Sequence, residues 1–234
     1  MDLPVRATDA DDRTMAPINL RPLPVRHAPA RRVTQLLVGL AVYGASMAMQ
    51  IRAGLGLNPW DVLHEGLALR TPLSFGVITA VTGVVVLLLW IPLRQRPGIG
   101  TVANVLVIAV TVDLGLALIP PAEGLAARIA LLLGGIVLNG LATAAYVGAR
   151  LSPGPRDGLM TGLAARTGWS VRLVRTGLEL TVLAAGWLLG GTAGVGTVLY
   201  ALAIGPLTQA FLPFLAVREV SAPPRPRPER APGR

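Results

Sequence analysis

Hydrophobic positions in this chain gather into six long stretches, separated by arginines or by glycine- and proline-rich breaks. The stretches approach or reach the roughly 17–25 residues that a helix needs to cross a bilayer. The pattern therefore predicts six spanning helices, over residues 33–51, 75–92, 101–119, 129–147, 171–189 and 195–215.

Two shorter helices are predicted over residues 60–69 and 156–166. Pro59 suits the first turn of a helix, and the carboxylate of Asp61 suits the positive helix end. A helix over 60–69 is only about 15 Å long at 1.5 Å per residue, too short to cross the hydrocarbon core. Each short helix is therefore either re-entrant or interfacial, and the sequence leaves both readings open.

An internal repeat underlies this order of elements. Residues 58–74 match residues 154–170 without a gap at nine of seventeen positions. The same offset of 96 residues pairs Gly100-Thr101-Val102 with Gly196-Thr197-Val198, and Gly39 with Gly135. A repeated pattern at fixed spacing indicates duplicated structural units.

Each copy of the repeat, 33–119 and 129–215, holds three spans and one short helix. Because three is odd, the copies must insert in opposite directions, which is the inverted-repeat arrangement of many transporters. The expected fold is an all-α membrane protein with six transmembrane helices and two short helices, built as two inverted three-span repeats.

Composition agrees with a membrane protein. Hydrophobic residues make up 53% of the chain and charged residues 14%, with a mean hydropathy of +0.61. A soluble domain carries about 25% charged residues. These values exclude a single-core soluble domain as the favoured class.

Residue usage also removes several kinds of chemistry. All 21 basic residues are arginine, so a Walker-type phosphate loop, which needs its lysine, is absent. The absence of cysteine removes disulfides, thiol catalysis and iron–sulfur clusters. His27 and His64 are the only histidines, and no hydrolase constellation is present. We expect no enzymatic activity, no cofactor and no metal site.

The arginines favour one topology. With both termini in the cytoplasm, 18 of the 21 arginines lie on the cytoplasmic side, and Arg52, Arg70 and Arg128 lie outside. This bias is the positive-inside rule and does not indicate nucleic-acid binding. The polar tails, 1–32 and 216–234, are expected to be disordered cytoplasmic segments. A cell-membrane location, in a bacterial inner membrane, follows as an expectation.

Asp61 and Asp157 occupy the same position in the two short helices. In one reading they belong to half-helices that dip into the membrane and line a solute pathway, because a carboxylate at membrane depth is costly and is a functional candidate by default. In the other they stabilise helix ends at the surface, worth about 0.3–1 kcal/mol each. The sequence does not decide between the two readings.

Two further spans carry charged candidates. Asp113 either pairs with Arg52 or Arg128 near the outer end of its span, which is the favoured reading, or titrates inside a cavity. Glu179 follows Arg175 by four residues, so an intrahelical ion pair is the simplest account. The alternative for this pair is an anionic-solute or proton-coupled site.

Smaller features have mainly structural interpretations. His64 stands beside Glu65, which is weak evidence for proton transfer, and surface exposure is favoured for the histidine. The equivalent glycines Gly66/Gly162 and Gly100/Gly196 favour close packing and tight turns over contact with a ligand. Thr101 and Thr197 follow glycines at helix starts and suit capping.

The segment 54–66, Gly-Leu-Gly-Leu-Asn-Pro-Trp-Asp-Val-Leu-His-Glu-Gly, resembles the hallmark of the YczE-like bacterial integral membrane proteins, which are related to the YitT group. The segments 98–104 and 154–160, with Asp113, are also similar to that family's pattern. The resemblance covers roughly residues 33–215. It implies a multi-spanning membrane protein and carries no established activity or catalytic residue to this chain.

Two functions are compatible with these features. The favoured one is a transporter or channel for a small solute or ion, with the lipid bilayer as its surroundings. The alternative is a membrane-embedded regulatory or assembly protein without a pathway, for which the low polarity of most spans argues. Oligomeric state and substrate stay open.

Overall fold

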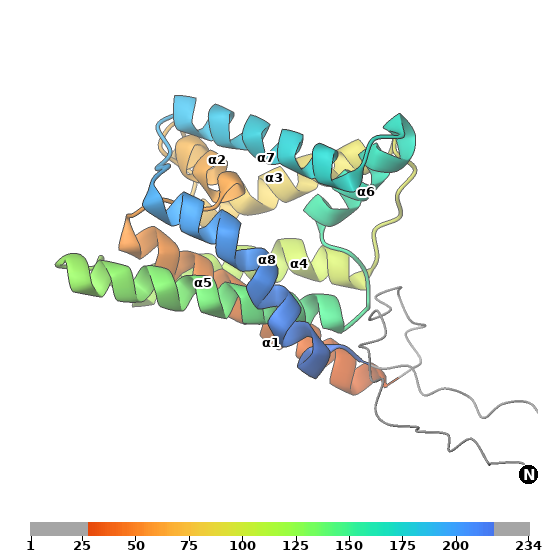
Figure 1. Ribbon diagram of the computed structural model, residues 1–234, viewed down its shortest axis with the longest axis horizontal. Helices are drawn as coiled ribbons and strands as arrows, with labels where there is room; N and C mark the ends of the chain where they lie inside the picture. Colours follow the sequence, from red (N-terminus) through yellow and green to blue (C-terminus); the bar gives the residue numbers. More distant parts are fainter. Residues whose placement is uncertain (1–27, 218–234) are drawn as a thin grey trace, which may run out of the picture.

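The computed structural model describes residues 28–217, and these form eight α-helices (Figure 1). Each predicted helix is present. The helices are α1 (Pro29–Ala53), α2 (Pro59–Ala68), α3 (Phe75–Trp90), α4 (Ile99–Leu118), α5 (Leu125–Gly148), α6 (Pro155–Thr167), α7 (Val171–Leu188) and α8 (Val195–Leu215).

The first helix begins earlier than the apolar pattern indicated. Residues 29–32, assigned from the sequence to the N-terminal tail, form the first turn of α1. The expected disorder of the rest of that tail, and of nearly all the C-terminal tail, concerns residues outside the described range.

Four of the described helices, α1, α4, α5 and α8, are long and apolar enough to cross a membrane. The other two predicted spans fall short by these criteria for different reasons. Helix α3 is apolar but has 16 residues, and α7 has 18 residues but carries Arg172, Arg175 and Glu179.

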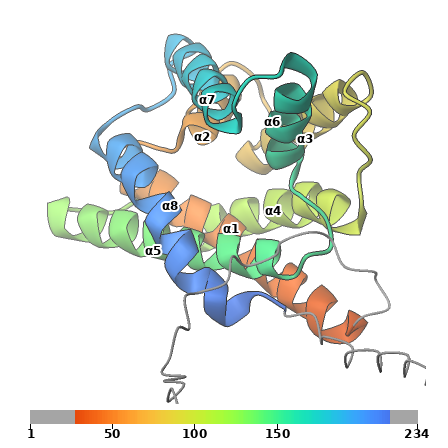
Figure 2. The same cartoon turned by 45° about the vertical axis from the view of Figure 1, so that its right-hand side comes forward.

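The helices form two layers (Figures 1 and 2). In one layer α1 packs against both α4 and α5, and α8 packs against α5. In the other, α2 packs against α7 and α3 against α6, with α2–α3 and α6–α7 contacts completing the layer. The four long apolar helices thus share one layer, and both short helices lie in the other.

The 96-residue offset recurs in the packing and in the backbone. The α1–α4 contact corresponds to α5–α8, and the α2–α7 contact corresponds to α6–α3. Every non-glycine residue with positive φ in the described range has a positive-φ glycine at the corresponding position. The pairs are Ala28 with Gly124, Arg94 with Gly190, and Arg150 with Gly54.

Helices α1 and α5 cross closely through glycines at the same repeat position. A Cβ atom on Gly39 would lie 3.0 Å from the Ala145 Cβ and 3.1 Å from the Tyr146 backbone nitrogen. A Cβ atom on Gly135 would lie 3.1 Å from the Ser46 carbonyl oxygen. Small residues at such crossings let two backbones approach closely in lipid.

Arginines from the same two helices close each other's C-terminal ends. Arg128 Nε donates to the Ala53 carbonyl (2.7 Å) at the end of α1, and its Nη2 donates to the Gly54 carbonyl. Arg32 Nε donates to the Ala149 carbonyl (2.8 Å) after α5, and its Nη2 to the Arg150 carbonyl (2.9 Å). Both donors and both acceptor pairs are related by the 96-residue offset.

A second arginine pair acts in the other layer. Arg70 Nε donates to the Leu189 carbonyl (3.1 Å) at the end of α7, and Arg166 Nη1 donates to the Pro92 carbonyl (3.0 Å) just after α3. The last carbonyls of a helix have no partner within the helix, and a cation there also complements the helix dipole. Sequence reasoning counted these arginines for topology and missed their capping role.

We expect Arg128→Met to lower the thermal unfolding midpoint of the purified protein in detergent by about 3–10 °C. Methionine keeps the apolar contacts of the side chain but leaves two carbonyls without their donor, a loss of about 1–3 kcal/mol for a polar group left unsatisfied. Arg172→Met is the control, since Arg172 is exposed and has no hydrogen bond or ion pair within residues 28–217. Equal midpoints for the two variants would contradict the capping role.

Candidate functional site

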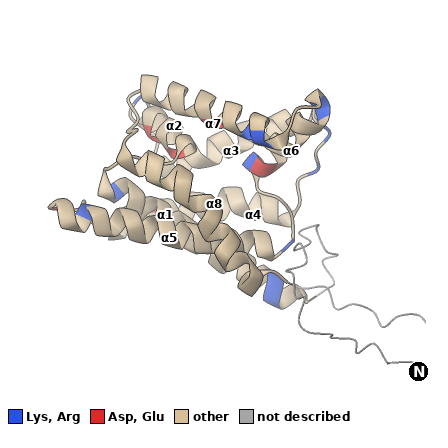
Figure 3. Cartoon of the chain, viewed as in Figure 1, with Lys and Arg blue, Asp and Glu red and all other residues tan. Residues whose placement is uncertain are grey.

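A cavity of about 680 Å³ lies among the helices of both layers, and each of the eight helices contributes a lining side chain. Figure 3 shows charges at helix ends and on α2, α6 and α7, while the middle of α5 and α8 is uncharged. The charged lining residues are Arg150, Arg156, Asp157, Arg175 and Glu179. A concave apolar site with a few polar groups is the usual form of a ligand site.

The first turns of the two short helices meet at this cavity. The Arg156 guanidinium of α6 lies over the Trp60 ring of α2, with its Cζ 4.8 Å from the ring centroid. Arg156 Nη2 is also 3.8 Å from Asp61 Oδ1. Trp60 and Arg156 occupy the same position in the two repeat copies, so one cation–π and ionic contact joins the copies.

Asp61 is fixed by the residues that start α2. Asn58 caps the helix: its Oδ1 accepts from the Asp61 backbone nitrogen (3.1 Å), and its Nδ2 donates to Asp61 Oδ2 (2.5 Å). Pro59 occupies the first turn, as the sequence indicated. Asp61 is 1% exposed, so its carboxylate lies inside the protein and away from any surface.

His64 is buried, which corrects the expectation that it would be exposed. Its side chain is 1% exposed, and its Nδ1 lies 3.3 Å from both Asp61 Oδ1 and Thr79 Oγ1. The ring also meets the Phe75 ring edge-on. One helical turn separates Asp61 from His64, so burying the first in α2 also turns the second inward.

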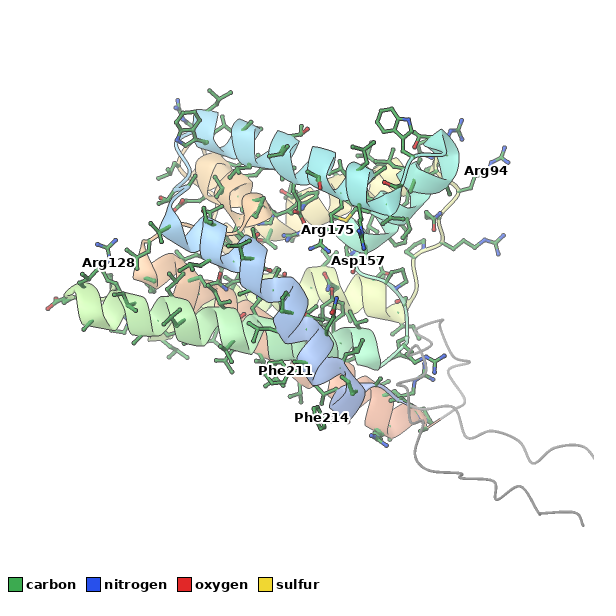
Figure 4. All side chains as sticks on the ribbon, in the orientation of Figure 1. Arg94, Arg128, Asp157, Arg175, Phe211 and Phe214 are labelled. Carbon is green, nitrogen blue, oxygen red and sulfur yellow. The ribbon has the colours of Figure 1, made fainter. Side chains whose placement is uncertain are left out.

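Asp157 lines the cavity from the first turn of α6. The Tyr146 hydroxyl donates to its Oδ2 (3.2 Å). Figure 4 shows Asp157 and Arg175 near one another between the two layers. Asp61 and Asp157 thus both belong to the region where the short helices meet, although only Asp157 faces the cavity directly.

Burial shifts the pKa of Asp157 and the pKa of His64 in opposite directions, and both residues lie on short helices outside the four long apolar helices. Burial raises the pKa of Asp157, and this is opposed first by the Tyr146 hydroxyl and then by Arg175. Burial lowers the pKa of His64, and the hydrogen bond to Asp61 opposes that change. In both cases removal from water disfavours the charged form.

The Arg175–Glu179 pair expected from the sequence is present. Arg175 Nε and Glu179 Oε1 are 2.9 Å apart, and both residues line the cavity. The arginine side chain is 54% exposed, so this ion pair contributes little to stability. Its place on the cavity wall keeps both residues among the candidates.

Asp113 does not pair with Arg52 or Arg128, and it does not line the cavity. Its Oδ1 accepts from the Gly76 backbone nitrogen (2.7 Å) and its Oδ2 from the Ser74 hydroxyl (2.5 Å). The first N–H groups of a helix need outside acceptors, and Asp113 supplies one at the start of α3. The two arginines are instead engaged with carbonyls at helix ends.

Sequence reasoning missed a tyrosine and asparagine pattern at the site. Tyr43 and Asn104 line the cavity in the first copy, and the offset maps them onto Asn139 and Tyr200 in the second. The Tyr200 hydroxyl donates to Asn139 Oδ1 (2.9 Å), and Asn139 Nδ2 donates to the Ser46 hydroxyl (2.8 Å). Each copy thus has one tyrosine and one asparagine, but the two residue types have exchanged positions. A repeat search that counts only identical residues does not detect this exchange.

Comparison with known proteins identifies the family. The model described as "Family of unknown function (DUF6198)" matches residues 30–213. An uncharacterized protein of Haemophilus influenzae is 39% identical over 189 residues, which is 81% of this chain and 87% of that protein. The chain belongs to this family.

Two Bacillus subtilis relatives extend the family. The uncharacterized membrane protein YczE is 35% identical over 185 residues, 78% of this chain and 86% of YczE. The uncharacterized protein YyaS is 25% identical over 182 residues, 76% of this chain and 90% of YyaS. No solved structure matches. The resemblance to YczE-like proteins is thereby confirmed, and the chain is a member of a membrane-protein family.

We expect Asp61→Asn and Arg156→Gln to be coupled in a double-mutant cycle. Each single change leaves one charge without its partner, whereas the double variant removes both charges, so it should be less destabilised than the sum of the single effects, by about 1 kcal/mol or more. The measurement is the thermal midpoint in detergent.

The control cycle is Arg175→Gln with Glu179→Gln, whose exposed pair should couple by only about 0.3–0.5 kcal/mol. Additive effects at Asp61 and Arg156 would show that their contact contributes nothing to joining α2 and α6.

Proposed function

We propose that this protein is a transporter or channel for a small polar solute or ion, and not an enzyme. The observation that carries the proposal is the cavity at which the first turns of α2 and α6 meet around Trp60, Asp61 and Arg156. Interrupted helices whose first turns converge on one site form the binding sites of many secondary transporters.

Buried charge supports a functional role for this region. Asp61 is 1% exposed and Asp157 is enclosed among Tyr146, Arg156 and Arg175. Charged groups at membrane depth are expensive and are typical of solute and proton pathways. A purely structural role would be served at lower cost by apolar side chains.

We infer six spans and two re-entrant helices, arranged as two inverted three-span repeats. Support comes from the matching helix contacts, the paired positive-φ positions and the reciprocal arginine caps, all at the same 96-residue offset. On this reading α3 and α7, about 24 and 27 Å long at 1.5 Å per residue, also cross the membrane, although the hydrocarbon is about 30 Å thick and must thin locally.

The same reading sets orientation. Both termini face the cytoplasm of a bacterial inner membrane, because most arginines then lie on the cytoplasmic side. Under this topology α2 returns to the outer surface and α6 to the inner surface. Their first turns are left in the middle of the membrane, beside the cavity.

The charges of the cavity bear on the solute. Arg156 and Arg175 lie near Asp61, Asp157 and Glu179, so acidic and basic groups alternate around the space. This balance favours a polar solute with hydrogen-bonding groups, or a proton-coupled one, over a simple anion. The tyrosines and Trp60 add amphipathic surface, which suits a partly apolar molecule.

A regulatory or assembly protein without a pathway is the second candidate. The observation in its favour is the tight closure around α2, where Asp61 and His64 are each 1% exposed. A fixed structural core would show the same burial.

Solute flux in proteoliposomes, screened across ions and small metabolites, separates the candidates. We expect Asp157→Asn and Asp61→Asn each to reduce flux at least about tenfold, a loss of about 1.4 kcal/mol in the transport barrier. Asp157→Asn removes a charge from the cavity wall, and Asp61→Asn removes the carboxylate that attracts Arg156.

The matched control is Asp113→Asn, since Asp113 caps α3 away from the cavity. Its flux should stay near that of the native protein, provided that all variants elute as folded protein. A broad screen without flux, together with a double aspartate variant that still complements a deletion strain, would contradict transport.

A further inference from the structure

Three side chains at the junction of α2 and α6 have a buried polar atom without a hydrogen-bond partner among residues 28–217: Trp60 (Nε1), Asp61 (Oδ1) and His64 (Nε2). Of the three, only His64 can take up a proton at a ring nitrogen that carries a lone pair. Its Nε2 is buried and has no hydrogen-bond partner within residues 28–217, although the residue borders the cavity. A buried nitrogen without a partner is costly. Neither helix capping nor the Arg156 contact requires a histidine here.

The neighbours of Nδ1 fix which nitrogen carries the hydrogen. The Thr79 hydroxyl already donates to the Phe75 carbonyl (2.9 Å), so towards His64 Nδ1 (3.3 Å) it can only accept. The second neighbour of Nδ1, Asp61 Oδ1, is a carboxylate oxygen and also an acceptor (3.3 Å). Nδ1 is therefore the N–H donor, and Nε2 carries a free lone pair.

Asp61 Oδ1 lies between the His64 ring and the Arg156 guanidinium. It lies 3.3 Å from His64 Nδ1 and 3.8 Å from Arg156 Nη2, and it has no hydrogen-bond partner among the described residues. The other oxygen, Oδ2, is held by Asn58. A protonated His64 would therefore gain its compensating charge from the same oxygen that attracts Arg156.

We propose that His64 is the proton-binding site of the cavity, with Nε2 as the acceptor and Asp61 as the counter-charge. The proposal rests on the proposed transport function and names the proton as its coupling ion. Binding is a simple addition: one proton joins Nε2, and the neutral ring becomes an imidazolium with both nitrogens as donors.

The charged groups that act on this ring are Asp61 from its own helix and Arg156 from α6. Helix α3 contributes the Thr79 hydroxyl and the Phe75 ring. Helix α7 packs on α2 through Gly186, against Leu63 and Gly66.

Proton binding would change the contact between the short helices. Once His64 is positive, Asp61 Oδ1 is shared between two cations, so its attraction for Arg156 weakens and the two cations repel each other. Because Arg156 joins α6 to α2, the junction loosens when the proton is present. Proton binding at His64 is thereby linked to the contact between the two repeat copies.

Nitrogen-15 NMR of histidine-labelled protein in nanodiscs tests the site directly with the proton as ligand. A His27→Gln change leaves His64 as the single histidine of the chain. We expect hydrogen on Nδ1 and a bare Nε2 at alkaline pH, followed by one protonation step on acidification.

Two variants should move the midpoint of that step in opposite directions. Asp61→Asn removes the counter-charge and should shift the midpoint to lower pH by about one unit, whereas Arg156→Gln removes the competing cation and should shift it to higher pH by a smaller amount. The control is Glu65→Gln, because the Glu65 carboxylate accepts from the Thr192 backbone nitrogen; it should leave the midpoint unchanged.

Hydrogen on Nε2 in the neutral ring, or a midpoint unmoved by both variants, would overturn the proposal, and either variant alone suffices if the other fails to fold. A different experiment tests the proposed function. Absence of solute flux would contradict transport, whereas a correct His64 titration would still establish the proton site.

Discussion

Hydrocarbon offers no hydrogen-bond partners, so each helix end inside this protein must find its partners in another helix. The solutions are reciprocal. Arg32 and Arg128 close the C-terminal ends of α5 and α1, and Arg70 and Arg166 do the same for α7 and α3. At the N-terminal end of α3, Asp113 accepts the hydrogen bond of the Gly76 N–H. These contacts tie distant parts of the chain together and fix the two layers on either side of the cavity.

The short helices begin inside the protein, so their first turns also need hydrogen-bond and charge partners there. Helix α2 begins with Asn58 as its cap, and the charged side chains of the two first turns balance one another: Arg156 lies against both Asp61 and the Trp60 ring. The first turns of α2 and α6 therefore bring ionisable side chains to the cavity, and the same side chains help to stabilise these helix ends. The same junction contains His64, whose free nitrogen is the feature that structure alone brings to light.

Local patterns in the sequence predicted the helices well, because apolar length and glycine–proline breaks are local properties. The Arg175–Glu179 pair was found for the same reason, since both residues lie on one helix. The burial of His64 and the partners of Asp113 depend on contacts with α3, and the sequence holds no local signal for them. The exchange of tyrosine and asparagine could have been predicted from the sequence, but only by comparing pairs of positions between the two copies and not by counting identical residues.

The proposed transport function requires that the cavity can be reached from both sides of the membrane. The natural chain has no cysteine, so a single Gly205→Cys, which lines the cavity and whose Cβ meets nothing within 4 Å, can report access by a membrane-impermeant thiol reagent. Val110→Cys, at an exposed position on α4, is the lipid-facing control. The account predicts that the cysteine at position 205 reacts in both right-side-out and inside-out vesicles while the control stays unreactive. Reaction from one side only, or from neither, would contradict it.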